Sequence, residues 1–264
     1  MRFPEFLKKN GTIGFVAPSF GCNIEPYKTS FNHALEKFHD MGYQTMLGPN
    51  CFEGSGIGIS NMPEKCAAEL NKMYLSDEAD ALISCGGGEL MCEILDDVDF
   101  DAIKAAKPKW YMGYSDNTNF TYLLTILCDT ASIYGPCAGA FGMSPWYDNI
   151  QDAYDLLRGK KLNQTGYKLW EKKSLKSEEN PLALINATEP RVLRVYNNGV
   201  LSDENDTIKF SGRFIGGCMD CLVNLLGTKY DKTVEFIEKY KNDGIVWFLE
   251  SCDLNVFAIR RAMW

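Results

Sequence analysis

The first half of the chain alternates short apolar runs with longer segments in which apolar residues recur every three or four positions. Tyr27, Phe31, Leu35 and Phe38, for example, lie at helical spacing, and Gly42 stands where a helix C-cap is expected. The apolar runs predict strands at 12–18, 43–49, 79–85 and 109–114. The periodic segments predict helices that begin near residues 27, 63, 99 and 116. This alternation favours right-handed crossovers and a mostly parallel sheet.

The alternation is lost after this first half. Residues 158–182 are polar and charged, which is typical of a linker or of a loop that covers a site. Further on, YNNGV at 196–200 predicts a hairpin, 233–243 is amphipathic, and a buried apolar strand ends in Glu250. We therefore expect an α/β fold with three parts: an N-terminal parallel-sheet domain (1–157), a linker or active-site loop (158–190) and a smaller C-terminal α/β domain (191–264).

Charge and hydropathy exclude several classes of function. The formal net charge is −8 and the isoelectric point is near 4.9, whereas affinity for a nucleic-acid backbone needs clustered Lys and Arg. No window approaches the ~20 apolar residues of a membrane span, and the start MRFPEFLKKNG lacks the apolar core of a signal peptide. We expect a soluble, cytoplasmic protein with no nucleic-acid or membrane partner.

The ten cysteines are scattered at irregular spacing through apolar segments, which predicts buried free thiols rather than a disulfide framework. Cys218 and Cys221 have CxxC spacing, which suits redox chemistry or half of a zinc site. No second CxxC and no histidine pair accompanies them, although zinc needs about four ligands. We favour two small apolar residues at a helix start, and we expect no metal and no organic cofactor.

Two turns that follow predicted parallel strands carry the candidate chemistry. They are CGGGE at 85–89 and GYSDNT at 113–118. Because ligands bind at the carboxyl ends of the strands in an open α/β sheet, both turns should face one crevice. Ser115 fits a nucleophile that works beside glycine N–H groups, and it fits equally well an N-cap of the following helix.

The remaining polar candidates have plain structural interpretations. The GGGE turn suits phosphate, but neither GxGxxG nor a Walker motif is present, so a nucleotide-binding domain is the weakest alternative. Glu250 fits a solvated strand end. His33 and His39 lie six residues apart on different faces of one predicted helix, and they do not predict a metal site.

Six segments together give the chain a resemblance to a known family. They are GTIGFVAPS (11–19), ISCGGGELMCEIL (83–95), KWYMGYSDNT (109–118), IYGPCAGAFGM (133–143), FIGGCMDCLVNLLGT (214–228) and FLESCDLNVFAIRRAMW (248–264). Each is weak alone, but together they span nearly the whole chain and resemble the LD-carboxypeptidases, a serine peptidase family, and within it the microcin C immunity peptidase-like branch. The resemblance implies a parallel α/β domain, a smaller C-terminal domain and a Ser–His–Glu triad in the cleft between them.

The resemblance also implies roles for single residues. Ser115 matches the nucleophile and Glu250 the residue that orients the histidine. The backbone N–H of Asp116 and one N–H of the loop from Gly86 to Gly88, preferentially that of Gly87, would form the oxyanion hole, with the rest of this loop against the substrate.

The triad histidine does not match any position. In the family it should lie several dozen residues beyond Glu250, whereas the sequence ends 14 residues beyond it, at Trp264, in an apolar helical segment with no cap. Neither His33 nor His39 sits in a matching motif. We therefore expect a fragment or a shortened chain, and the apolar surface left by a missing segment leads us to expect a homodimer.

The resemblance suggests two substrate classes, the L,D-peptide bond of a muropeptide or the bond between an aminoacyl or peptidyl group and a nucleotide analogue. Trp170, within the polar segment, fits stacking on a nucleobase over the cleft, or simple anchoring of the loop. Our leading hypothesis is a serine hydrolase of amide bonds in small peptides. The alternative is an inactive, truncated relative that binds peptide or nucleotide-peptide ligands without turnover.

Overall fold

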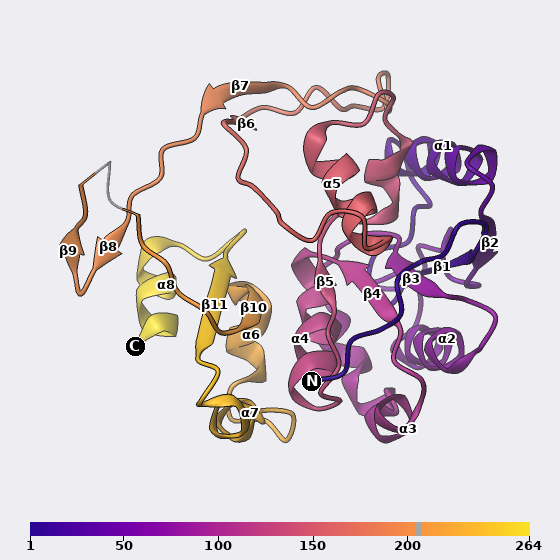
Figure 1. The fold of residues 1–264 in the computed structure, drawn as a ribbon. Coiled ribbons are helices and arrows are strands. Elements are labelled where there is room, and N and C mark those ends of the chain that lie inside the picture. The colour runs from indigo at the N-terminus through magenta and orange to yellow at the C-terminus, as the bar shows by residue number, and fades with distance from the viewer. Residues whose placement is uncertain (204–206) are drawn as a thin grey trace.

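The computed structural model of the protein describes residues 1–203 and 207–264. Its N-terminal part is built on a parallel sheet of five strands in the order β2-β1-β3-β4-β5 (Figure 1). The strands are β1 (Thr12–Val16), β2 (Gln44–Leu47), β3 (Ala81–Ser84), β4 (Trp110–Gly113) and β5 (Ile133–Tyr134). Every neighbouring pair is parallel, which confirms the α/β fold class.

Helices cover both faces of this sheet, because successive strand residues point to opposite sides. On β1, Phe15 packs with α1 and α5, whereas Val16 packs with the helices of the other face. The first face carries α1 (Tyr27–Asp40), the 3₁₀ helix η3 (Ala138–Gly142) and α5 (Asp148–Leu157). The second face carries α2 (Pro63–Leu75), η1 (Met91–Asp97), α3 (Phe100–Ala105) and α4 (Thr118–Ile126), the last preceded by the short η2 (Ser115–Asn117).

The C-terminal part is a smaller α/β unit around two parallel strands, β10 (Arg213–Cys218) and β11 (Ile245–Glu250). Its helices are α6 (Met219–Leu225), α7 (Thr233–Tyr240) and α8 (Val256–Met263). The prediction of a strand that ends in Glu250 is confirmed, but the prediction that it is buried is wrong. β11 pairs only with β10, so its residues are partly or largely exposed, and α8 buries none of its residues.

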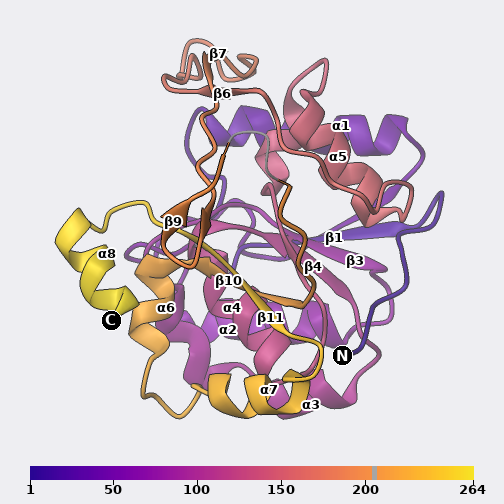
Figure 2. The ribbon, with the colours of Figure 1, turned by 60° about the vertical axis from the view of Figure 1, so that its left-hand side comes forward.

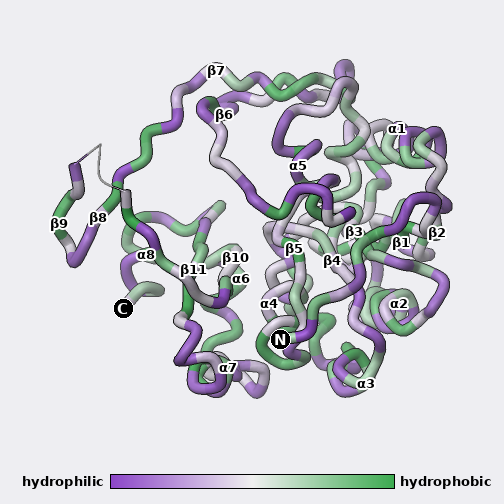
Figure 3. The backbone as a smooth tube through the Cα atoms, in the orientation of Figure 1, coloured by the Kyte–Doolittle hydropathy of each residue, from purple (hydrophilic) through white to green (hydrophobic). Residues whose placement is uncertain are grey.

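The segment between the two units contains two antiparallel hairpins and arches over one end of the molecule (Figures 1 and 3). The first hairpin pairs β6 (Leu169–Glu171) with β7 (Ala187–Pro190), and the second pairs β8 (Tyr196–Asn197) with β9 (Val200–Leu201). The second hairpin was predicted from YNNGV. Residues 204–206 of the predicted strand-and-turn region lie outside the described residues, and the domain limits at 157 and 190 stay predictions.

Helix α4 joins the two units (Figure 2). All nine of its residues are buried. Phe120 and Leu124 pack into the core beneath the sheet, whereas Tyr122 and Leu123 pack against a separate cluster that contains Ile215 of β10. The helix therefore has no solvent-facing side.

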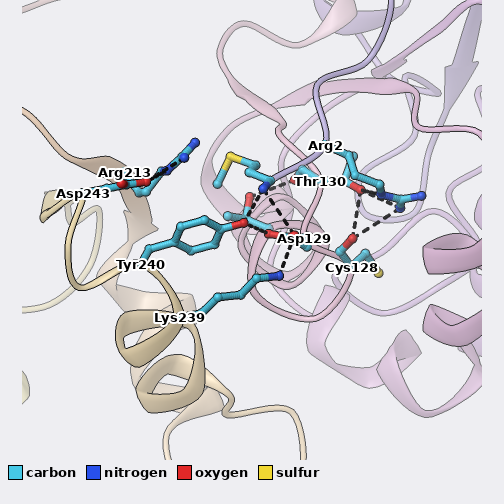
Figure 4. A network of polar contacts seen from close by, with 10 residues as sticks. Arg2, Cys128, Asp129, Thr130, Arg213, Lys239, Tyr240 and Asp243 are labelled. Carbon is cyan, nitrogen blue, oxygen red and sulfur yellow. Dashed lines mark hydrogen bonds and ion pairs between the residues drawn. The ribbon is translucent and has the colours of Figure 1, made fainter.

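A polar cluster fastens α7 to the N-terminal part (Figure 4). The Asp129 carboxylate accepts a hydrogen bond from the Tyr240 hydroxyl at 2.7 Å and pairs with Lys239 at 2.8 Å and with the Met1 amino group at 3.3 Å. Burial opposes the charge of Asp129, but these donors outweigh it and lower its pKa. Because its partners come from both parts of the chain, this cluster holds α7 against the end of α4.

Other expectations from the sequence stand as follows. The predicted strands and helices of the first half all form, with limits shifted by a few residues. The cysteines are free thiols, and eight of the ten are buried. Within the described residues, no helix combines the length and apolar character needed to cross a bilayer.

Glu69 of α2 is a buried carboxylate that joins two strand ends. Its Oε1 accepts the N–H of Ala17, after β1, at 2.7 Å, and its Oε2 accepts the N–H of Asn50, after β2, also at 2.7 Å. Burial raises the pKa of Glu69 to about 7, and the two N–H donors offset this only in part.

This geometry predicts that stability declines as the pH rises from 4.5, the ordinary pKa of a glutamate, to about 7. In that range the folded state keeps the Glu69 proton and the unfolded state has lost it, so the free energy of unfolding should fall by about 3 kcal/mol. Urea unfolding at several pH values gives the free energy of unfolding as a function of pH. This free energy should fall less steeply with pH in Glu69→Gln than in the unmodified protein. Glu64→Gln, at an exposed position on the same helix, should leave the pH dependence unchanged. An unchanged slope in Glu69→Gln would contradict the prediction.

Candidate active site

Ser115 sits on the sharp turn between β4 and α4. Its backbone is in the left-handed region, with φ of 61°, a conformation that costs a non-glycine residue about 1–3 kcal/mol. The Ser115 N–H donates a hydrogen bond to the Tyr134 hydroxyl at 2.8 Å. The turn therefore presents the serine side chain at the carboxyl end of the sheet, as expected for the crevice of an open α/β sheet.

The glycine turn after β3 lies directly against Ser115. A Cβ at Gly87 would meet the Ser115 Oγ at 3.3 Å and its Cβ at 3.2 Å, which is tighter than most side-chain contacts, so the glycine eases the close approach of the loop to Ser115. The Gly87 carbonyl accepts the Phe20 N–H at 2.6 Å, which fixes the loop from its outer side. The prediction that both turns face one crevice is confirmed.

The Asp116 side chain is a buried structural anchor. Its Oδ2 accepts hydrogen bonds from Ser19 Oγ at 2.5 Å and from the Met91 N–H at 2.9 Å, and its Oδ1 accepts from Asn119 Nδ2 at 2.9 Å. Burial raises the pKa of Asp116 in spite of these donors. These bonds hold the turn in place. The carboxylate is used in structural contacts, so Asp116 can contribute only its backbone to the reacting centre.

Glu250 reaches this turn from the C-terminal unit through Tyr134. The Tyr134 hydroxyl donates to Glu250 Oε1 at 2.5 Å while it accepts from the Ser115 N–H. Burial, together with the Glu250 carboxylate, raises the pKa of Tyr134 well above its ordinary value of 10, so the phenol keeps its proton. One hydroxyl thus ties the serine turn to the end of β11.

Asp220, at the start of α6, holds the loop that follows Glu250. Its carboxylate accepts hydrogen bonds from the Ser251 hydroxyl at 3.0 Å and from the backbone N–H groups of Cys252, Asp253 and Leu254 at 3.0 to 3.1 Å. Partial burial opposes ionisation, but these donors outweigh it and lower the pKa of Asp220. These bonds fix the backbone that follows Glu250, so the end of β11 has a defined position beside the serine turn.

A cavity of about 830 Å³ opens beside Ser115. Its walls come from the glycine loop, from the segment 134–150 and from the long loop through Glu171, Ser174, Lys176 and residues 183–185. A second, smaller cavity of about 70 Å³ lies on the other side of the serine, between Cys92, Asp116 and Asp220. The serine thus borders two spaces, of which only the larger suits a substrate of several residues.

A sequence profile described as the LD-carboxypeptidase N-terminal domain matches residues 13–135, which include Ser115 and the glycine loop. This match and the relatives below support an LD-carboxypeptidase-like family for the chain. Among its relatives is the microcin C7 self-immunity protein MccF of Escherichia coli, 26% identical over 261 residues that cover 97% of this chain and 70% of that protein. A probable murein peptide carboxypeptidase of Bacillus subtilis (strain 168) is 30% identical over 115 residues, which cover 44% of this chain and 34% of that protein. The family and these relatives indicate a peptidase-type function.

Solved structures share the fold. A structure of MccF in complex with glutamyl sulfamoyl guanosine superposes with a TM-score of 0.75 at 21% identity, covering 98% of this chain and 73% of that chain. A MccF-like protein from Bacillus anthracis str. Ames gives 0.75 at 19% identity, with 100% and 75% covered. A MccF-like protein from Streptococcus pneumoniae in complex with AMP gives 0.71 at 18% identity, with 96% and 76% covered.

The structure brings most of the residues expected from the LD-carboxypeptidase resemblance into one place. Ser115 and Gly86–Gly88 line the large cavity, and Glu250 reaches Ser115 through Tyr134. Trp170 lies on β6, is about half exposed and does not line that cavity, so its contact with substrate stays a prediction.

The histidines and the CxxC pair do not line the large cavity, but Cys218 and Cys221 line the small one, and Cys221 Sγ lies 3.7 Å from the Ser115 carbonyl oxygen. His33 and His39 lie on α1, and His33 Nδ1 is 2.9 Å from the Gly142 carbonyl oxygen. Cys218 and Cys221 are buried at the start of α6, as expected, and no metal-binding cluster of side chains occurs in the part of the chain that the structure describes.

Sequence reasoning missed Tyr134 and Asp220. Tyr134 lies in the segment IYGP that carries part of the family resemblance, and this was its only signal. Asp220 lies inside the CxxC, and a single carboxylate between two cysteines forms no recognisable motif of its own.

The double contact of Tyr134 predicts that Tyr134→Phe destabilises the protein. Loss of the hydroxyl removes one bond to Glu250 and leaves the Ser115 N–H without its acceptor, so the free energy of unfolding should fall by about 1–3 kcal/mol. Urea unfolding measures this, with Tyr147→Phe as control because the Tyr147 hydroxyl has no hydrogen bond to the described residues. Equal stability of the two variants would show that the Tyr134 bonds contribute nothing.

Proposed function

We propose that the protein is a serine hydrolase that cleaves an amide bond in a small peptide or peptide-like substrate. The observation that carries this proposal is Ser115, held in the left-handed region at the end of a parallel strand, with a glycine loop against its hydroxyl and a cavity of about 830 Å³ beside it. A strained serine on such a strand-to-helix turn is the arrangement of a nucleophile elbow. A serine that only capped a helix would need neither a left-handed backbone at Ser115 nor a glycine loop packed against its hydroxyl.

In this mechanism the Ser115 Oγ attacks the substrate carbonyl carbon and forms a tetrahedral intermediate. The N–H groups of Gly87 and Asp116 stabilise its oxyanion, because fixed donors in a water-poor site stabilise developing charge strongly. The hydroxyl proton passes to a histidine that is neither His33 nor His39 and whose tautomer Glu250 fixes, and this histidine then gives the proton to the leaving amine. Collapse of the intermediate expels the amine, and water then hydrolyses the acyl-enzyme.

Two substrate classes remain as proposals. The murein relative favours an L,D-peptide bond in a muropeptide, and the MccF relatives, whose structures hold glutamyl sulfamoyl guanosine and aspartyl sulfamoyl adenosine, favour an aminoacyl nucleotide. In the muropeptide the acyl side is the larger part and D-alanine leaves, whereas in the aminoacyl nucleotide the leaving group is the larger part. A cytoplasmic location and a homodimer are part of this proposal.

A specific observation supports a second candidate, binding without turnover. Within the described residues, no histidine lines the cavity beside Ser115, and the two histidines on α1 lie outside it. A serine hydroxyl without a base is a poor nucleophile at neutral pH. In this case the same cavity would hold the peptide or nucleotide-peptide ligand and release it unchanged.

Labelling and turnover together separate the two candidates. An activated fluorophosphonate should modify the protein once, detected by intact mass, and the Ser115→Ala variant should stay unmodified. The same two proteins are then incubated with a muropeptide tetrapeptide that ends in D-alanine and with aspartyl sulfamoyl adenosine, and the products are measured by mass spectrometry. Turnover that is lost in Ser115→Ala supports the hydrolase. Ligand binding by calorimetry, with neither labelling nor turnover, supports the binding protein.

Gly87→Ala tests the glycine loop separately. The new methyl group would press on the Ser115 hydroxyl, and a displacement of about 1 Å at a reacting group lowers rates by about 100-fold. Because the added Cβ calls for a shift of only a few tenths of an ångström, the rate of fluorophosphonate labelling should fall by less than this factor, while circular dichroism shows a folded protein. An unchanged rate would mean that the loop is not part of the reacting centre.

A further inference from the structure

The long loop supplies one wall of the cavity and is fixed in place by hydrogen bonds. The Ser30 hydroxyl of α1 donates to the Pro181 carbonyl at 2.7 Å, and the Asn186 N–H donates to Glu171 Oε2 at 2.6 Å. The first bond fastens the loop to α1, and the second closes the loop across its base, with Lys176 between Glu171 and Asn186. The loop therefore has a defined conformation, and the positions of its side chains in the cavity wall are defined as well.

Lys176 is the one lysine or arginine among the described residues that line this cavity. Its ammonium group lies 5.9 Å from the centre of the Tyr27 ring, and no carboxylate of the described residues lies within ion-pair distance of it. Partial burial lowers its pKa. A charged group that has lost part of its hydration without gaining a counterion is costly, and a bound anion would relieve that cost.

A chain of contacts relates Lys176 to Ser115. Tyr27, beside the ammonium group, packs edge-on against Phe20 with 5.1 Å between ring centres. The N–H of Phe20 holds the carbonyl of Gly87, and Gly87 lies against Ser115. Lys176 and Ser115 thus line the same cavity and are linked by contacts through Tyr27, Phe20 and Gly87. An anion at Lys176 would therefore lie in the cavity that Ser115 borders.

We propose that Lys176 binds a carboxylate or phosphate group of the substrate in this cavity. Asn149 also lines this cavity, and its Oδ1 has no hydrogen-bond partner in the described residues. The inference rests on the proposed function only in treating the bound ligand as a substrate. The recognised chemistry is an anion, held by one ammonium group above an aromatic ring.

Binding to the Ser115→Ala protein tests this without any need for turnover, so failure of the hydrolase proposal would not affect the result. Calorimetry compares two pairs of probes, AMP with adenosine, and a tetrapeptide ending in D-alanine with its C-terminal amide. Each pair is measured in Ser115→Ala alone and with Lys176→Met, Lys176→Arg or Lys172→Met added. Lys172 is the control because it is exposed on the same loop and does not line the cavity.

At least one anionic probe should bind about 10- to 100-fold more weakly after Lys176→Met, as expected for a lost charge-assisted hydrogen bond. Its neutral counterpart should be unaffected, Lys176→Arg should retain most of the affinity, and Lys172→Met should change nothing. A loss confined to AMP identifies a phosphate, and a loss confined to the peptide acid identifies a carboxylate. The inference is overturned if no probe distinguishes Lys176→Met from Lys172→Met, including the case in which none of them binds.

Discussion

The burial of α4 on every side is the constraint on which the site depends. A helix with one exposed side can shift or rotate to relax its first turn, but α4 is packed against the sheet core on one side and against the C-terminal cluster on the other. Its start is fixed, and Ser115 must take up the left-handed backbone that joins it to β4. The packing of the whole helix offsets the cost of the strained Ser115 backbone. The hydrogen bond from the Ser115 N–H to the Tyr134 hydroxyl adds to this stabilisation.

The same helix explains why the C-terminal unit takes part in the site. The backbone of β10 approaches the first turn of α4 so closely that a Cβ at Gly217 would lie 2.6 Å from Thr118 Oγ1, and the Cys218 N–H donates to that same oxygen at 2.9 Å. Parallel pairing then places Glu250 beside Cys218, at the end of β11. The contact between the two units thus fixes the position of the Glu250 carboxylate. The missing side chain of Gly217 allows this contact.

Much of the site could be predicted because it follows from local pattern. Ser115 and the glycine loop each follow a short apolar strand, and the geometry of parallel sheets brings such turns together. The Tyr134–Glu250 bond joins residues 116 positions apart, and no local pattern records such a pairing. The exposure of β11 was missed for a related reason. Apolar composition shows that a strand can be buried, but only the sheet order shows that one of its edges has no neighbour.

The contact between Tyr134 and Glu250 leaves the orienting role of Glu250 open to a further partner. An ionised carboxylate has two oxygens with about four lone-pair directions, and the phenol uses one of them on Oε1. Glu250 is largely exposed, so its second oxygen can accept an imidazole N–H without displacing the tyrosine. Because the phenol keeps its proton, it fixes the carboxylate and does not compete for a proton in catalysis. In the proposed mechanism Tyr134 would therefore prepare Glu250 to orient a histidine, while the same hydroxyl accepts the Ser115 N–H and holds the turn that such a histidine would serve.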